Sequence, residues 1–128
     1  MLKIATLGLF AALIALPCAA QAQSKKGPNG GTIMSSQGHP IEFVASGQDL
    51  TFFLGDDDGS PLATKGFKGK ATIQDGGKTM TVALQPAAPN KLVGKAENPL
   101  GSKARVVFSA SFRAGSHSHT LTARYVTE

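Results

Sequence analysis

Residues 103–113 have the sequence KARVVFSASFR, in which apolar and polar side chains alternate. Successive side chains of a β-strand point to opposite faces, so this period of two is typical of a strand that buries one face. The expected inner side chains are those of Ala104, Val106, Phe108, Ala110 and Phe112. The expected outer ones are those of Lys103, Arg105, Val107, Ser109, Ser111 and Arg113. We therefore predict a long strand with Val106, Phe108 and Phe112 in a hydrophobic core.

Six further segments predict strands, five by the same alternation and the Leu-Val pair as a short strand, at the spacing of roughly 8 to 12 residues that is typical of all-β domains. They are residues 41–45, 50–54, 71–73, 79–85, 92–93 and 120–125. Glycine, proline, asparagine and aspartate separate them, and no segment after residue 22 has a helical period of apolar residues. Together the segments predict a single immunoglobulin-like antiparallel β-sandwich of about seven strands, spanning residues 32–128.

The same alternation assigns individual side chains and turns. In residues 41–45, Ile41, Phe43 and Ala45 are expected on the inner face, with Glu42 and Val44 on the outer face. Hairpin turns are expected at residues 76–77 (Gly-Gly) and 114–116 (Ala-Gly-Ser), because glycine adopts the positive φ angles that tight hairpins require.

The first 22 residues have the three regions of a secretory signal peptide. Lys3 supplies a positive charge, residues 4–16 are almost entirely apolar, and residues 20–22 (Ala-Gln-Ala) suit a signal peptidase that cuts before Gln23. Cys18 follows a proline, which does not fit a lipoprotein signal, so we expect the thiol to leave with the signal peptide. The sequence therefore predicts a periplasmic chain that is not inserted in the membrane, with residues 23–31 as a flexible leader.

The overall charge is moderately positive. The chain has 13 Lys and Arg residues against 8 Asp and Glu residues, a net charge of +5. The only close basic cluster is Lys65, Lys68 and Lys70, interrupted by glycines and one phenylalanine. A nucleic-acid interface would combine clustered charges with exposed aromatic side chains for stacking. We therefore interpret the cluster as a solvated face and expect no nucleic-acid partner.

No motif of an enzyme is present. The sequence lacks a nucleophile elbow, a glycine-rich phosphate loop between a strand and a helix, and a carboxylate pair placed by a motif. The run Asp56-Asp57-Asp58-Gly59 resembles part of a calcium loop, but Phe67 stands at the twelfth position, where a calcium loop needs glutamate. A turn that ends a strand explains this run better. We therefore expect a non-enzymatic protein.

The histidines are the candidate metal ligands. His117 and His119 are two residues apart at the start of the last expected strand, which places both imidazoles on one face. His39 begins an earlier strand, and the three imidazoles could converge if both strands start at the same end of the sandwich. Imidazole nitrogens suit copper or zinc, and the thioether of Met34 would favour copper. Alternatively, these are strand-end histidines that bond to backbone or water.

Several motifs resemble those of a known group of proteins. They are Gly27-Pro28-Asn29-Gly30-Gly31, His39-Pro40-Ile41-Glu42-Phe43-Val44, Leu50-Thr51-Phe52-Phe53-Leu54, Asp58-Gly59-Ser60-Pro61-Leu62, Gly69-Lys70-Ala71-Thr72-Ile73, Gly76-Gly77-Lys78-Thr79, Pro89-Asn90-Lys91-Leu92 and Ala123-Arg124-Tyr125. This pattern resembles small exported β-sandwich proteins of proteobacteria, most of them uncharacterised. It is also similar to the N-terminal periplasmic module of heavy-metal efflux pump adaptor subunits. In these proteins a Gly-Gly pair often precedes a strand-leading histidine, as Gly30-Gly31 precedes His39 here. The resemblance implies an accessory periplasmic role in metal handling, without the long helical hairpins of the adaptors.

Two functions therefore remain open. In the first, a periplasmic non-enzymatic β-sandwich binds copper or zinc through His39, His117 and His119 and serves an envelope protein or a metal-efflux component. In the second, the domain binds no metal and contacts another envelope protein through its sheet edges or loops. Convergent histidines would favour the first function, and dispersed histidines the second.

Overall fold

The computed structural model describes residues 24–128, in which all regular secondary structure is β-strand. The expected signal peptide, Cys18 and the expected cleavage site before Gln23 lie outside these residues. Within residues 24–128 no helix has the length and apolar character needed to cross a membrane.

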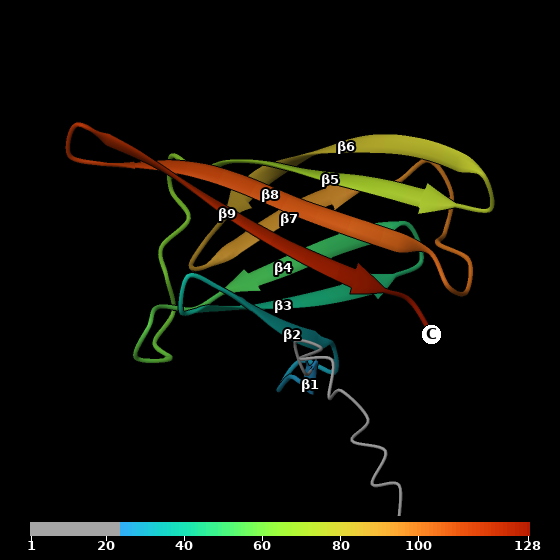
Figure 1. The fold of residues 1–128 in the computed structure, drawn as a ribbon, viewed down its shortest axis with the longest axis horizontal. Helices are drawn as coiled ribbons and strands as arrows, with labels where there is room; N and C mark the ends of the chain where they lie inside the picture. The colour runs from blue at the N-terminus through green and yellow to red at the C-terminus, as the bar shows by residue number, and fades with distance from the viewer. Residues whose placement is uncertain (1–23) are drawn as a thin grey trace, which may run out of the picture.

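The described residues form nine strands in one sheet (Figure 1). The strands are β1 (Lys25–Lys26), β2 (Thr32–Ser36), β3 (His39–Ser46), β4 (Asp49–Leu54), β5 (Lys68–Asp75), β6 (Lys78–Ala87), β7 (Lys91–Lys95), β8 (Arg105–Ala114) and β9 (His117–Val126). Their order across the sheet is β1-β2-β3-β4-β7-β6-β5-β8-β9, and every neighbouring pair is antiparallel.

The all-β, antiparallel character predicted from the sequence is confirmed, and the seven expected segments correspond to β3 through β9. The arrangement differs from the expected sandwich, because the strands of residues 24–128 form one continuous sheet. Strand β6 provides this continuity: residues 78–84 pair with β5, and residues 85–87 pair with β7. Alternation shows which side chains point inward, but it does not reveal whether a long strand joins two sets of strands.

The sheet curls into a half-barrel, and its two edge regions meet along a line that we call the seam. Here β9 approaches β2 and β3 (Figure 1). The Gln37 side-chain amide donates to the carbonyl of Thr120 (3.0 Å), and the backbone amide of Thr122 donates to the Ser36 hydroxyl (3.1 Å). The Tyr125 hydroxyl donates to the carbonyl of Ile41 (2.6 Å). The seam is therefore held by side chains rather than by a strand ladder.

The concave face of the half-barrel contains the core. The ring of Phe52 lies 4.8 Å from the ring of Phe43, 4.5 Å from that of Phe108 and 6.0 Å from that of Tyr125, measured between centroids. These rings come from both ends of the sheet order, so they join β3 and β4 to β8 and β9. Fully buried aliphatic side chains surround them: Ile41, Leu50, Leu54, Ile73, Leu92, Val106 and Leu121.

Most inward and outward assignments are confirmed, and three need correction. Val106 and Phe108 are fully buried, and Lys103, Arg105 and Arg113 are exposed, as expected. Phe112 is only half-buried, because it lies near the tip of the β8–β9 hairpin. Ala45 is exposed rather than buried, since β3 leaves the core there. Glu42 is buried rather than exposed, because the loop of residues 27–31 covers it.

Both predicted hairpin turns are present. Gly76 and Gly77 have φ angles of 57° and 85°, so both central residues of the β5–β6 turn are left-handed, as in a type I′ turn. Gly115 has a φ angle of 65° in the turn that joins β8 to β9. The short β2 was missed because its sequence, TIMSS, has no apolar alternation. Strand β1 lies within the segment that was expected to be a flexible leader.

The core predicts a large effect of truncating Phe108. We expect Phe108→Ala to lower the free energy of unfolding by about 3 to 5 kcal/mol, because it removes a fully buried ring and leaves a cavity beside Phe52. Thr81→Ala, at an exposed position of β6, should change it by less than about 0.5 kcal/mol. Urea denaturation measures both, and a loss below about 1 kcal/mol for Phe108→Ala would contradict this packing.

Candidate functional site

The β8–β9 hairpin positions two of the three histidines. In its register His117 pairs with Ala114 and His119 with Phe112, so the two imidazoles project from the same side of β9. Both histidines are exposed. Neighbouring positions on one side of a strand lie about 6 to 7 Å apart, which allows two imidazoles to reach one ion. The structure thus confirms that these side chains share a face.

Aromatic stacking holds the imidazole of His119. Its ring centroid lies 5.4 Å from that of Phe112, with an angle of 25° between the planes. Phe112 in turn stacks on Phe67, with centroids 4.5 Å apart and planes within 5°. Phe67 is buried, so the stack connects the exposed imidazole to the core. His119 is therefore the more restrained member of the pair.

His39 lies in a different environment. It is the first residue of β3 and is half-buried, with Nδ1 3.1 Å from the carbonyl oxygen of Gly55. Nδ1 also lies 3.9 Å from a carboxylate oxygen of Asp56. An Nδ1–H that donates to Gly55 would leave the lone pair on Nε2, which is the atom available to a metal ion in that tautomer.

The structure does not gather the three histidines into one ligand cluster. Within residues 24–128, the only group of three potential metal-binding side chains whose donor atoms lie within 4.8 Å of one another is Asp56, Asp57 and Asp58. Gln37, in the turn that precedes His39, donates to the carbonyl of Thr120, the residue after His119. Met34, considered as a thioether ligand, packs against the core.

The three aspartates form the strand-ending turn that the sequence predicts. The backbone amide of Asp56 donates to the carbonyl of Ser60 (2.6 Å), and Gly59 has a φ angle of 86°. The Asp58 carboxylate accepts from both the hydroxyl and the backbone amide of Ser60. These bonds, the hydroxyl first, lower the pKa of Asp58. The carboxylates thus have a role within the turn.

The most unusual polar group of the chain was not predicted. The Glu42 carboxylate is 4% exposed and accepts three hydrogen bonds from one loop, residues 27–31. Asn29 donates through its backbone amide (3.0 Å) and its side-chain amide (2.9 Å), and the backbone amide of Gly31 donates at 2.8 Å. The loop therefore covers the outer face of β3 and buries a residue that alternation placed in solvent.

Glycines allow the loop to approach so closely. A Cβ atom at Gly27 would overlap the Glu42 carboxylate, and one at Gly31 would overlap the carbonyl of Phe43. Gly30 has a φ angle of 81°, so the Gly-Gly pair combines a left-handed residue with one that must lack a Cβ atom. A signal was available: a lone glutamate in the apolar run 41–44, preceded by a Gly-Pro-Asn-Gly-Gly segment able to supply amide donors.

Tyr125 lies close to the Glu42 site. Burial first, and then the charge of Glu42, raise the pKa of the Tyr125 hydroxyl. The hydroxyl therefore stays protonated and donates to Ile41 across the seam. Glu42 and Tyr125 together connect the loop of residues 27–31, β3 and β9.

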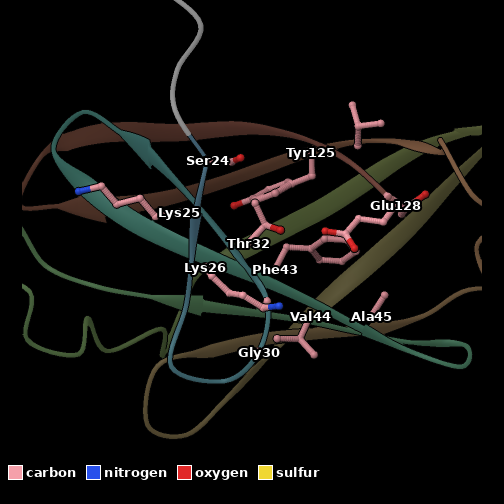
Figure 2. A pocket seen from close by; sticks show the side chains of 13 residues that line it. Ser24, Lys25, Lys26, Gly30, Thr32, Phe43, Val44, Ala45, Tyr125 and Glu128 are labelled. Carbon is pink, nitrogen blue, oxygen red and sulfur yellow. The ribbon is translucent and has the colours of Figure 1, made fainter.

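A pocket of about 450 Å³ lies between residues 24–32, β3 and the C-terminal end of β9. Figure 2 shows Ser24 and Lys25 along one side and Tyr125 and Glu128 along the other, with Phe43 between them. The pocket combines the rings of Phe43 and Tyr125 with the ammonium group of Lys26 and the carboxylate of Glu128. None of the histidines lines it, so it is separate from the candidate metal ligands.

Comparison with known proteins adds no functional assignment. The chain matches no protein-family model, no curated protein and no solved structure.

The Glu42 cluster predicts a specific loss of stability. In Glu42→Gln, the remaining oxygen can still accept from the backbone amides of Asn29 and Gly31, and the Asn29 side-chain amide can flip to accept from the new NH₂ group. The buried bonds then lose the charge of their acceptor, and hydrogen bonds to a charged acceptor are roughly twice as strong as neutral ones. We expect the free energy of unfolding to fall by about 1 to 3 kcal/mol, measured by urea denaturation. Glu97→Gln removes the same charge at an exposed position and should be nearly neutral. Equal stability of the two variants would show that the loop does not depend on Glu42.

Proposed function

We propose that the chain is an exported, periplasmic, non-enzymatic binding protein that holds copper(II) or zinc(II) through His117 and His119 on the β8–β9 hairpin. The observation that carries this proposal is the pair of exposed imidazoles on one side of β9. Two imidazoles at this spacing bind one ion as a chelate, with water or a partner's groups completing its coordination.

The restraint on His119 supports the proposal. Because its ring is stacked on Phe112, less side-chain freedom is lost when a metal ion binds than for a fully mobile histidine. We do not include His39 in this site. The three imidazoles do not form a group whose donor atoms all lie within 4.8 Å of one another.

The position of the hairpin supports an accessory role in metal handling. The turn between β8 and β9 projects beyond the neighbouring strands (Figure 1), so an ion held there is accessible to a second protein. An open, two-histidine site suits an ion that is passed on, because a partner can add ligands. Such a partner would be an envelope protein or a component of a metal-efflux system.

The seam favours a second candidate function, metal-free contact with an envelope protein. The backbone groups of Thr120 and Thr122 point into the seam, where Gln37 and Ser36 engage them. Alternate residues of a strand direct their backbone N–H and C=O groups to the same side. The backbone groups of Arg124 and Val126 therefore also point toward the seam, beside the 450 Å³ pocket. A strand edge next to a pocket can accept an extended peptide segment.

Calorimetric titration of the protein, purified without a histidine tag, tests the metal site. Copper(II) should bind more tightly than zinc(II), following the usual order for nitrogen ligands. Affinity should fall between pH 7 and pH 5, because protons compete with the metal ion for imidazole. The double variant His117→Ala/His119→Ala should lose binding and keep its thermal unfolding temperature, since both positions are exposed.

His39→Ala is the matched control, because it removes an imidazole outside the hairpin and should leave the affinity for copper(II) unchanged. Unchanged copper affinity in the double variant would refute the proposed site. The metal-free module would then be the better interpretation of the fold.

A further inference from the structure

The convex face of the half-barrel carries a line of cations that we call the cationic track: Lys68, Lys70, Arg105, Arg113 and Arg124. They lie on β5, β8 and β9, and all five are exposed. Lys70, Arg105 and Arg124 alternate with buried residues such as Ala71, Val106 and Ala123, which point to the core. Lys68 and Arg113 continue the same alternation toward the ends of their strands. The five side chains therefore share the outer face of the sheet.

The strand register places these cations at even steps along the strand direction, on three neighbouring strands. Residues of β5, β8 and β9 that lie side by side form rows across the outer face, and each row contains one member of the track. In order, the rows are Gln74, Arg105 and Val126; Thr72, Val107 and Arg124; Lys70, Ser109 and Thr122; Lys68, Ser111 and Thr120; and Arg113 with Ser118. Successive rows are two residues apart, or about 7 Å, so the track extends over roughly 27 Å.

No carboxylate neutralises the track. The only acidic residue in β5, β8 and β9 is Asp75. It lies two residues after the inward-pointing Ile73, on the same side of β5, and its carboxylate accepts a hydrogen bond from the backbone amide of Gly101 (2.9 Å). In the part of the chain that the structure describes, the one ion pair is that of His39 with Asp56. The positive charges of the track are therefore available to a ligand.

Three shallow hollows follow the track. Lys68, Lys70, Ser109 and Ser111 line one of about 200 Å³. Arg105 and Arg124 line another of about 340 Å³, and Lys68 and Arg113 a third of about 320 Å³. All five cations thus border a depression. Hydroxyl groups stand between the cations in the middle rows, on Ser109, Ser111, Thr120 and Thr122.

We propose that the cationic track binds a linear acidic polysaccharide, with its carboxylate or sulfate groups on the cations and its sugar hydroxyls on the serine and threonine side chains. An extended polyanion matches one cation per row over five rows, whereas a small anion would need convergent charges. The outer side chains of these rows include no aromatic ring for base stacking, which disfavours a single-stranded nucleic acid.

The affinity must come from the whole track. A single exposed ion pair contributes little, but five fixed cations along one polymer act together and attract it electrostatically. Salt screens such exposed charges, so binding should weaken steeply as ionic strength rises. The proposal is independent of the metal site, because neither His117 nor His119 belongs to the track.

Binding to fluorescently labelled oligogalacturonate tests the proposal, with chelator present so that no metal ion bridges the two. We expect binding at low ionic strength that weakens between 50 and 200 mM salt. Lys70→Gln/Arg124→Gln should reduce the affinity about tenfold, since it removes two adjacent charges from the middle of the track. Lys78→Gln/Lys95→Gln removes the same net charge from exposed positions off the track and should change the affinity less than about twofold.

Two further polymers test which class of ligand the track binds. Neutral dextran should not bind, and oligothymidylate should bind more weakly than oligogalacturonate. Equal losses in the two double variants, with equal thermal unfolding temperatures, would show attraction to net charge only and overturn the proposal. Tighter binding of oligothymidylate would overturn it in favour of a nucleic acid, and no binding of oligogalacturonate at low salt would remove it.

Discussion

The contact between Phe52 and Phe108 exists only because the sheet curls. These residues lie on β4 and β8, which β7, β6 and β5 separate in the sheet order, yet their ring centroids are 4.5 Å apart. A flat sheet would leave both rings, and the apolar face around them, in water, at a cost of about 25 cal/mol for each Å² of apolar surface. Curvature therefore follows from the alternation of the strands. It also creates the convex face and brings β9 against β2 and β3.

The seam shows how the two edges meet without a strand ladder. Tyr125 donates to Ile41 from the inner side, Gln37 and Ser36 engage β9 near its start, and the loop of residues 27–31 covers β3 from outside through Glu42. Each contact uses a polar group with a defined partner, and no buried side-chain nitrogen or oxygen in residues 24–128 lacks one. The end of the seam beside Tyr125 and Glu128 borders the 450 Å³ pocket.

Local sequence patterns predicted what depends on single strands. The alternation of side chains along a strand predicts which residues of β8 point inward and that His117 and His119 share a face. The positive φ angles that tight turns require predict the glycine turns. Features that depend on several segments were not predictable in this way. Glu42 is buried by a loop that lies eleven or more residues away in the sequence.

The single sheet exists because one part of β6 pairs with β5 and the other part with β7. The cationic track depends on the register of three strands. Its members look dispersed along the chain, which explains why the sequence indicated only a solvated face.

The curl of the sheet can be tested directly, because the chain contains a single tyrosine, Tyr125. The Tyr125 ring lies 5.2 Å from that of Phe43 and 6.0 Å from that of Phe52, across the seam. Nuclear Overhauser effects measured from selectively labelled tyrosine ring protons should therefore reach the rings of Phe43 and Phe52. Effects confined to Val106 and its neighbours on β8, with none to β3 or β4, would show that the two edges do not meet and would contradict the half-barrel.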